Sequence, residues 1–138
     1  MIFIAVLFVV HFQQNEWDLL STVDIVIGFD EFMGTDIEKP VFSSELEQRA
    51  GTDISLEGFV IPIQQASSHG YFVLSRFPYQ SCFFCGAAGP ETVVEVYSRE
   101  KFSLMDERVY VEGKLQLNHD SPLHLFFIIK DAKVKKLN

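Results

Sequence analysis

The chain contains a succession of short apolar runs, each about as long as a β-strand and separated by turn-forming residues. The clearest run, residues 92–97 (TVVEVY), is rich in β-branched residues and alternates between two faces. Similar runs occupy residues 53–63, 71–77, 108–117 and 123–130. Runs of this length and spacing predict a mainly β protein.

Turn-forming residues divide these runs in a way that favours a closed sheet. Residues 118–122 (NHDSP) form a turn cluster, so the runs on either side of it are predicted to pair as a hairpin. Gly58 indicates a bulge or a close approach of another backbone, and Pro62 marks an edge or an end. Closure of a sheet removes its exposed edges. We therefore expect a small OB-like β-barrel of five to six strands with one short helix, with a two-sheet sandwich as the alternative.

The segment before these runs predicts one more strand and the helix. Residues 23–32 (VDIVIGFDEF) read as a strand, followed by a polar turn around residues 34–36 and Pro40. Ser44 and Glu47 match a capping box at the start of a helix. Gly51 is placed to end that helix in a left-handed conformation.

The length and the N-terminal composition define the domain organisation. A chain of 138 residues corresponds to one domain. Residues 1–10 are apolar, too few for a membrane span of about 20 residues but typical of a signal-peptide core. No Lys or Arg precedes the run, and a buried N-terminal strand is the alternative. We interpret residues 1–14 as a signal-peptide remnant and residues 15–138 as a single OB-like barrel domain, and expect a periplasmic or extracellular location.

The charge argues against nucleic acid as a partner. The formal net charge is -8 and the pI is near 4.8, so the chain would repel phosphate backbones. Four lysines near the C-terminus make a locally basic end, which a frayed, solvated terminus also explains: Lys130, Lys133, Lys135 and Lys136.

Both cysteines lie in the stretch Cys82-Phe83-Phe84-Cys85, which is followed by a glycine. This pattern is typical of a knuckle in which two thiolates reach one metal ion from a tight turn. A structural zinc site needs four ligands, and the chain has no second cysteine pair. The candidates that could complete a site with zinc or another transition metal are a second copy of the pair or four side chains of this chain: His69, Glu91, His119 and His124.

Other interpretations of the cysteine pair stay open. A disulfide that closes a small loop suits an exported protein. Reduced core thiols are a further alternative, whereas thioredoxin-like redox chemistry is disfavoured because a glycine-rich turn and a strand follow Cys85 instead of a helix. The predicted hairpin would bring His119 and His124 near each other, as a Cys₂His₂ site requires.

Motifs that would indicate an enzyme are missing from the sequence. The chain has no Gly-x-Ser-x-Gly elbow, no phosphate-binding Gly-Lys-Ser/Thr and no His-Glu-x-x-His. The acidic residues Asp30, Glu31 and Asp36 lack the spacing of an EF-hand loop, so we interpret them as solvated carboxylates. No sequence feature argues for catalysis.

Several blocks together resemble an uncharacterised family of small exported bacterial proteins, often predicted to be OB-like. These blocks are residues 39–43 (KPVFS), 56–62 (LEGFVIP), 71–97 and 111–115 (VEGKL), and the match covers roughly residues 17 to 134. In that family a G-[FY]-[VIM]-[IV]-P strand precedes an F-x-L strand, a cysteine-bearing loop and a V-x-V strand. Some relatives carry Cys-x-His in place of Cys82-x-x-Cys85, which implies a ligand role. The resemblance implies fold and export, and no activity.

The sequence therefore predicts an exported, non-enzymatic binding module. Its Cys82/Cys85 loop is expected to hold a transition metal or to engage a protein partner. One alternative is a thiol-active periplasmic protein, and another is a structural envelope protein with an inert disulfide.

Overall fold

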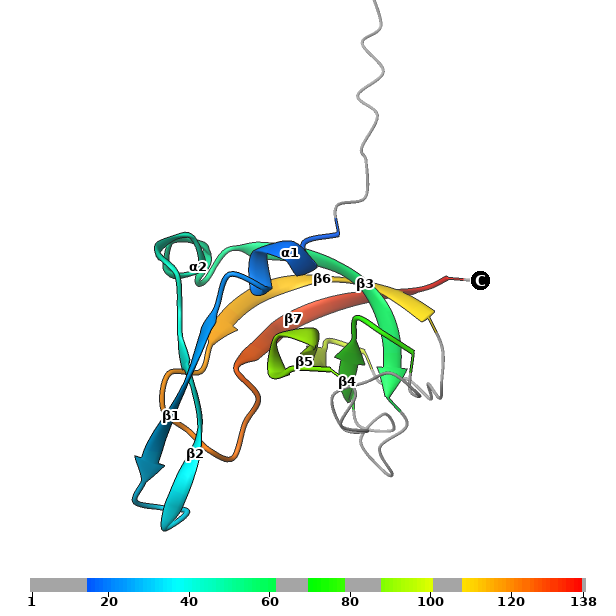
Figure 1. The fold of residues 1–138 in the computed structure, drawn as a ribbon. Coiled ribbons are helices and arrows are strands. Elements are labelled where there is room, and N and C mark those ends of the chain that lie inside the picture. The colour runs from blue at the N-terminus through cyan, green and yellow to red at the C-terminus, as the bar shows by residue number, and fades with distance from the viewer. Residues whose placement is uncertain (1–14, 62–69, 79–87, 101–107, 138) are drawn as a thin grey trace, which may run out of the picture.

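The computed structural model describes residues 15–61, 70–78, 88–100 and 108–137, and shows a closed five-stranded barrel with a hairpin beside it (Figure 1). The strands follow the order β3-β4-β5-β7-β6, and β6 pairs with β3 to close the sheet. β5 and β7 run parallel, and the other neighbours are antiparallel. The barrel strands are β3 (Asp53–Ile61), β4 (Tyr71–Ser75), β5 (Val93–Ser98), β6 (Arg108–Leu117) and β7 (Phe127–Lys136).

The expected mainly β, OB-like barrel is confirmed, but the last strand differs from its prediction. β7 begins at Phe127 because Asn118 holds the preceding segment as a loop: its Nδ2 donates to the carbonyl oxygens of Ser121, His124 and Leu125 at 2.8 to 3.1 Å. β7 then continues to Lys136, where it still pairs with Val109 of β6. The C-terminal lysines therefore belong to a strand and not to a frayed end.

A two-stranded hairpin precedes the barrel. β1 (Asp24–Asp30) matches the predicted strand, and Gly34 adopts a φ of 68° in the turn that follows. The prediction of a turn that extends to Pro40 is wrong, because β2 (Thr35–Val41) pairs with β1 along its whole length. Pro40 lacks an N–H, but among the described residues no strand pairs with the other edge of β2. No hydrogen bond of a ladder is therefore lost there, and Pro40 is tolerated.

The described residues also form three short helical turns: α1 (Trp17–Leu20), α2 (Ser44–Arg49) and the 3₁₀ helix η4 (Pro90–Thr92). α2 is the predicted helix, and Gly51 after it has the expected left-handed φ of 79°. The predicted capping residue is wrong by one position. Ser43, not Ser44, is the N-cap, because its hydroxyl accepts a hydrogen bond from the Leu46 N–H at 3.2 Å.

Apolar side chains from every barrel strand fill the interior, and α1 contributes the indole of Trp17. The indole Nε1 donates to the Glu57 carbonyl oxygen at 2.6 Å, which anchors α1 on β3. A second, smaller apolar cluster contains Ile61, Val73 and Val93, with Tyr71 and Leu125 packed against it. In the described part of the chain, no helix is both long enough and apolar enough to cross a membrane.

Candidate functional site

The outer face of β4 and β5 carries a buried carboxylate. Side chains alternate along β5, so Val94 and Val96 join the barrel core while Glu95 points to the outside. Glu95 is nevertheless only 4% exposed. A buried carboxylate is costly unless hydrogen bonds compensate it.

Three donors surround the Glu95 carboxylate. The Tyr71 hydroxyl donates to Oε1 at 3.0 Å, and the Leu125 backbone N–H donates to Oε2 at 3.1 Å. His124 Nδ1 lies 3.2 Å from Oε1 and 3.1 Å from Oε2. Glu95 thereby attaches the loop of residues 118–126, which joins β6 to β7, to the sheet.

The contact with Glu95 orients the imidazole of His124. When Nδ1–H donates a hydrogen bond to the carboxylate, the neutral ring presents the lone pair of Nε2. No described residue bonds to this Nε2, and the His124 side chain is 45% exposed. A carboxylate behind a histidine is the arrangement that orients metal-binding imidazoles in many proteins.

Two tyrosines extend this network along the sheet. The rings of Tyr71 and Tyr97 lie 5.0 Å apart between centroids, and Lys130 Nζ lies 3.7 Å from the centre of the Tyr97 ring. Burial raises the pKa of Tyr71 above its ordinary value of 10.0, and the negative charge of Glu95 raises it further. Burial followed by the same charge also raises the pKa of Tyr97.

The raised pKa of Tyr71 predicts a loss of stability in alkaline solution. The folded chain holds this proton more tightly than the unfolded chain, so the stabilisation is complete below the ordinary pKa of 10.0 and declines as the pH rises above it. The free energy of unfolding should fall by at most about 1.4 kcal/mol per pH unit for each such proton. In Tyr71→Phe, the free energy of unfolding in urea, measured between about pH 8 and about pH 12, should decline less steeply than in the wild type. An equally steep decline in the variant would contradict the assignment.

Glu91 lies in η4, at the start of β5. Its Oε2 atom is buried and has no hydrogen-bond partner in the part of the chain that the structure describes. The carboxylate folds back over Gly89, where a side chain would collide with it. Since buried polar atoms are nearly always bonded, this oxygen requires an explanation, such as an ion.

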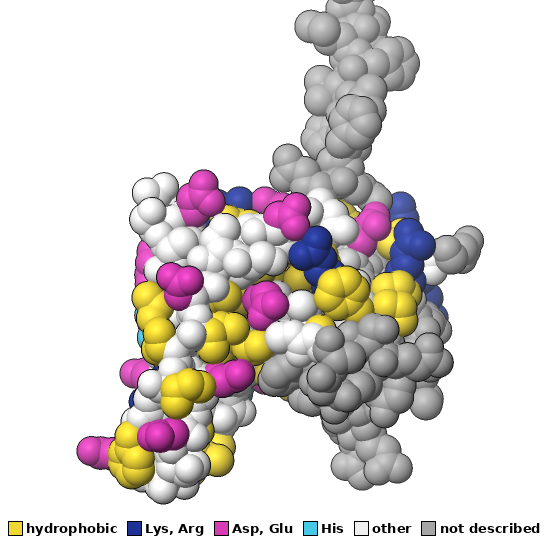
Figure 2. Space-filling view, in the orientation of Figure 1, with side chains coloured by type: hydrophobic (Ala, Val, Ile, Leu, Met, Phe, Trp, Pro, Cys, Tyr) yellow, Lys and Arg dark blue, Asp and Glu magenta, His cyan; other side chains and the backbone are white. Residues whose placement is uncertain are grey.

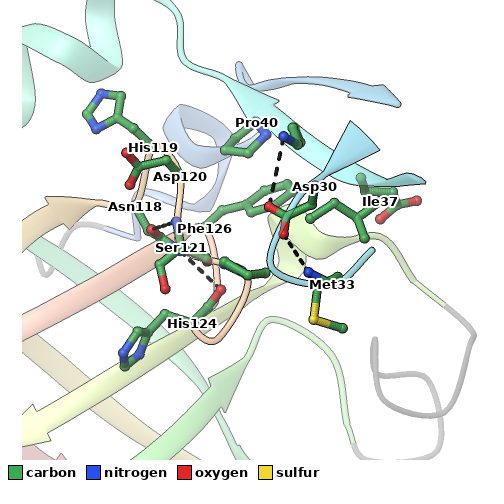
Figure 3. Close-up of a pocket in the computed structure, with 13 residues that line it drawn as sticks. Asp30, Met33, Ile37, Pro40, Asn118, His119, Asp120, Ser121, His124 and Phe126 are labelled. Carbon is green, nitrogen blue, oxygen red and sulfur yellow. Dashed lines mark hydrogen bonds and ion pairs between the residues drawn. The ribbon is translucent and has the colours of Figure 1, made fainter. Parts of the chain in front are cut away.

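The structure does not bring His119 and His124 together. His119 Nε2 lies 2.8 Å from Glu47 Oε1 of α2, and its ring packs edge-on against Phe42 with centroids 5.1 Å apart. Figure 3 shows the two imidazoles on opposite sides of the 118–126 loop, pointing away from each other. Each histidine thus contacts a different carboxylate, His119 that of Glu47 and His124 that of Glu95.

Cys82, Cys85 and His69 lie outside the described residues. The connection that carries the cysteines leaves the described chain after Pro78 and rejoins it at Ala88. Ser75 pairs with Val93 at this end of the barrel. Since Glu95 pairs with Ile128 of β7, the loop of residues 118–126 also reaches this end. One end of the barrel therefore carries Glu91, His124 and the two points, Pro78 and Ala88, at which the cysteine connection meets the described chain.

A cleft of about 210 Å³ separates the β1–β2 hairpin from the 118–126 loop (Figure 3). Asp30 lines it, and its Oδ1 accepts a hydrogen bond from the Met33 N–H at 2.9 Å. Lys39 Nζ lies 3.9 Å from the other carboxylate oxygen of Asp30. The sequence interpretation of Asp30 as a solvated carboxylate is wrong, because this side chain turns into the hairpin and is buried.

Sequence reasoning did not single out Glu95 or Tyr71, which form the buried hydrogen-bond network of this site. A usable signal was present, because Glu95 is the single charged residue within an otherwise apolar strand. The partner side chains gave no comparable signal, since Tyr71 and His124 are 24 and 29 residues away along the chain.

The chain matches no protein-family model, and the search of curated proteins finds no match. The resemblance to an exported bacterial family therefore stays a prediction, and the site is interpreted from its own residues. Within the described ranges, no group of three or more His, Cys, Asp or Glu side chains is placed to hold a metal ion. Two donor atoms at this end of the barrel have no hydrogen-bond partner among the described residues, Glu91 Oε2 and His124 Nε2.

Proposed function

We propose that the protein is an exported, non-enzymatic binding module that binds a transition metal through Cys82 and Cys85, with Glu91 as a third ligand. The observation that carries this proposal is the buried Glu91 Oε2, which has no partner among the described residues. Glu91 follows Cys85 closely in the sequence, at the end of the barrel where the cysteine connection rejoins the described chain.

The chemistry of these groups suits zinc or a related metal. Zinc binds thiolate sulfur, imidazole nitrogen and carboxylate oxygen, usually with four ligands in all. An unpaired carboxylate oxygen is costly to bury, and a cation beside it would offset that cost. The metal would thus account for a feature of Glu91 that the described protein atoms leave unexplained.

His124 is the histidine best suited to be the fourth ligand. Glu95 bonds its Nδ1, which leaves Nε2 as the atom that would face a metal ion. His119 is less suited because its Nε2 is already bonded to Glu47. His69 stays a sequence-based candidate.

Metal analysis of protein purified without a histidine tag tests the proposal. We expect one zinc, copper or iron ion per chain in the wild type and none in Cys82→Ser. Glu91→Gln should weaken the affinity at least tenfold, because the neutral amide loses the charge that the metal requires. His119→Gln is the matched control and should bind the metal as the wild type does. Wild-type protein without metal, or full affinity in Glu91→Gln, would refute the proposal.

The same protein preparations distinguish the alternative functions. An inert disulfide would show as a two-proton mass increase on reduction. A thiol-active protein would show an alkylation midpoint well below the free-cysteine pKa of about 8.5. The described chain continues from Ala88 into η4 and β5, so the helix that lowers a thiol pKa in thioredoxin-like proteins does not follow this motif within those residues.

Export is supported by the apolar segment of residues 1–10 and by the family resemblance. Residues 1–14 lie outside the described structure. The intact mass of protein recovered from the periplasm or the medium would show whether this segment has been removed.

A further inference from the structure

The β1–β2 hairpin exposes most of the large apolar side chains on the described surface. It projects from the barrel, and Figure 2 shows apolar and acidic side chains interspersed along it. Seven of the nine exposed large hydrophobic residues belong to it: Ile25, Val26, Ile27, Phe29, Phe32, Met33 and Val41. Soluble proteins rarely concentrate apolar side chains in this way unless the surface binds a partner.

The apolar residues occupy both faces of the hairpin. Ile25, Ile27 and Phe29 alternate with Val26 along β1, and the register places Val41 on the same face as Val26. A two-stranded hairpin is only marginally stable in water, and a third strand would stabilise it. The exposed apolar side chains and unpaired edges of the hairpin are therefore those expected of a sheet that gains a further strand on binding.

The two outer edges of the hairpin differ in their capacity to accept that strand. Neither edge is paired within the described residues. β2 carries Pro40, which lacks an N–H, and Lys39, and both residue types protect edges from pairing. β1 (DIVIGFD) has seven residues with neither proline nor lysine. An added strand would therefore lie along the part of β1 that precedes Phe29, whose carbonyl oxygen already accepts a hydrogen bond from Lys39 Nζ.

The charge of the hairpin identifies the chemistry of the partner. Four acidic residues are exposed on it: Asp24, Glu31, Asp36 and Glu38. The one lysine, Lys39, already donates to the Phe29 carbonyl oxygen at 2.9 Å. A second copy of the chain would bring acidic residues against acidic residues, in a chain whose net charge is -8. A basic segment would be attracted.

We propose that the β1 edge binds an extended segment of another protein in which basic and apolar residues alternate, and that this segment adds to the hairpin as a third strand. Main-chain hydrogen bonds would supply affinity, as in other cases of strand addition. The apolar side chains of the segment would cover those of β1, and its lysines or arginines would meet the surrounding acids. This inference does not depend on the metal site.

Titration of the full chain with a capped peptide of alternating lysine and valine tests the proposal. We expect the backbone amide resonances of β1 to shift, whereas those of the closed barrel, which has no free edge, should not. A peptide with alternate valines replaced by proline should not bind, because it cannot complete the ladder. Ile27→Lys should weaken binding at least tenfold.

The matched control is Leu123→Lys, since Ile27 and Leu123 are both 68% exposed and the two substitutions change the charge equally. We expect the control to change the affinity less than twofold. Equal weakening in both variants would reduce the interaction to general charge attraction and overturn the proposal. Binding of the proline peptide would also overturn it, as would concentration-dependent β1 shifts without peptide, which would assign the hairpin to a second copy. Fluorescence of Trp17 reports whether each variant keeps its barrel.

Discussion

Gly113→Ala is expected to destabilise the barrel by about 3 kcal/mol, because the space for a side chain at this position is occupied by atoms of the facing strand β7. A Cβ atom would lie 2.6 Å from Ile129 Cγ2, 2.7 Å from the Lys130 carbonyl oxygen and 3.0 Å from Ala132 Cα. The register of β6 against β7 shifts at this point, and Asp131 opposite has a positive φ of 51°. Gly113 therefore permits the bend that closes the barrel.

Gly28→Ala is the matched control for this prediction, since Gly28 also lies within a strand. The nearest atoms to its added Cβ would be Cδ and Cε of Lys39, at 3.3 and 3.6 Å, in a flexible side chain. Its effect should stay within about 0.5 kcal/mol. Urea unfolding followed by the fluorescence of Trp17, the only tryptophan, measures both variants. Equal stability of the two variants would contradict the close approach of β6 and β7.

Phe127→Ala is expected to cost about 3–5 kcal/mol, because it removes a fully buried ring from the core. The Phe127 ring packs against Phe42 with centroids 5.7 Å apart. Phe127 also pairs with Leu117 at the point where the 118–126 loop enters β7. The substitution should therefore loosen the loop that carries His124, in addition to lowering the free energy of unfolding.

Phe32→Ala is the control, since Phe32 is 71% exposed in the hairpin turn. The same chemical change there should alter the free energy of unfolding by about 0.5 kcal/mol or less. The two variants can be compared by urea unfolding under identical conditions. A loss of similar size in both would show that Phe127 does not belong to the core.

The local features of this fold were accessible to prediction from the sequence. The alternation of residues 92–97 identified β5 and placed Val94 and Val96 on one face, and the structure shows that this face lines the core. The left-handed conformation of Gly51 and the close approach at Gly58, where an added Cβ would collide with the Ser75 carbonyl oxygen, also followed from local patterns. β2 was missed because its polar residues and Pro40 are typical of a turn, and pairing with β1 overrides that preference.

Strand identity depends on the backbone and side-chain preferences of neighbouring residues, and these are present in any short window of the chain. The site depends on which strands become neighbours when the barrel closes. Glu95 is buried and bonded to Tyr71 and His124 because β4 and β7 lie on either side of β5, the latter in parallel. The separation of His119 from His124 likewise comes from Glu47 and Glu95, which belong to different elements. Such contacts are long-range, and no local pattern encodes them.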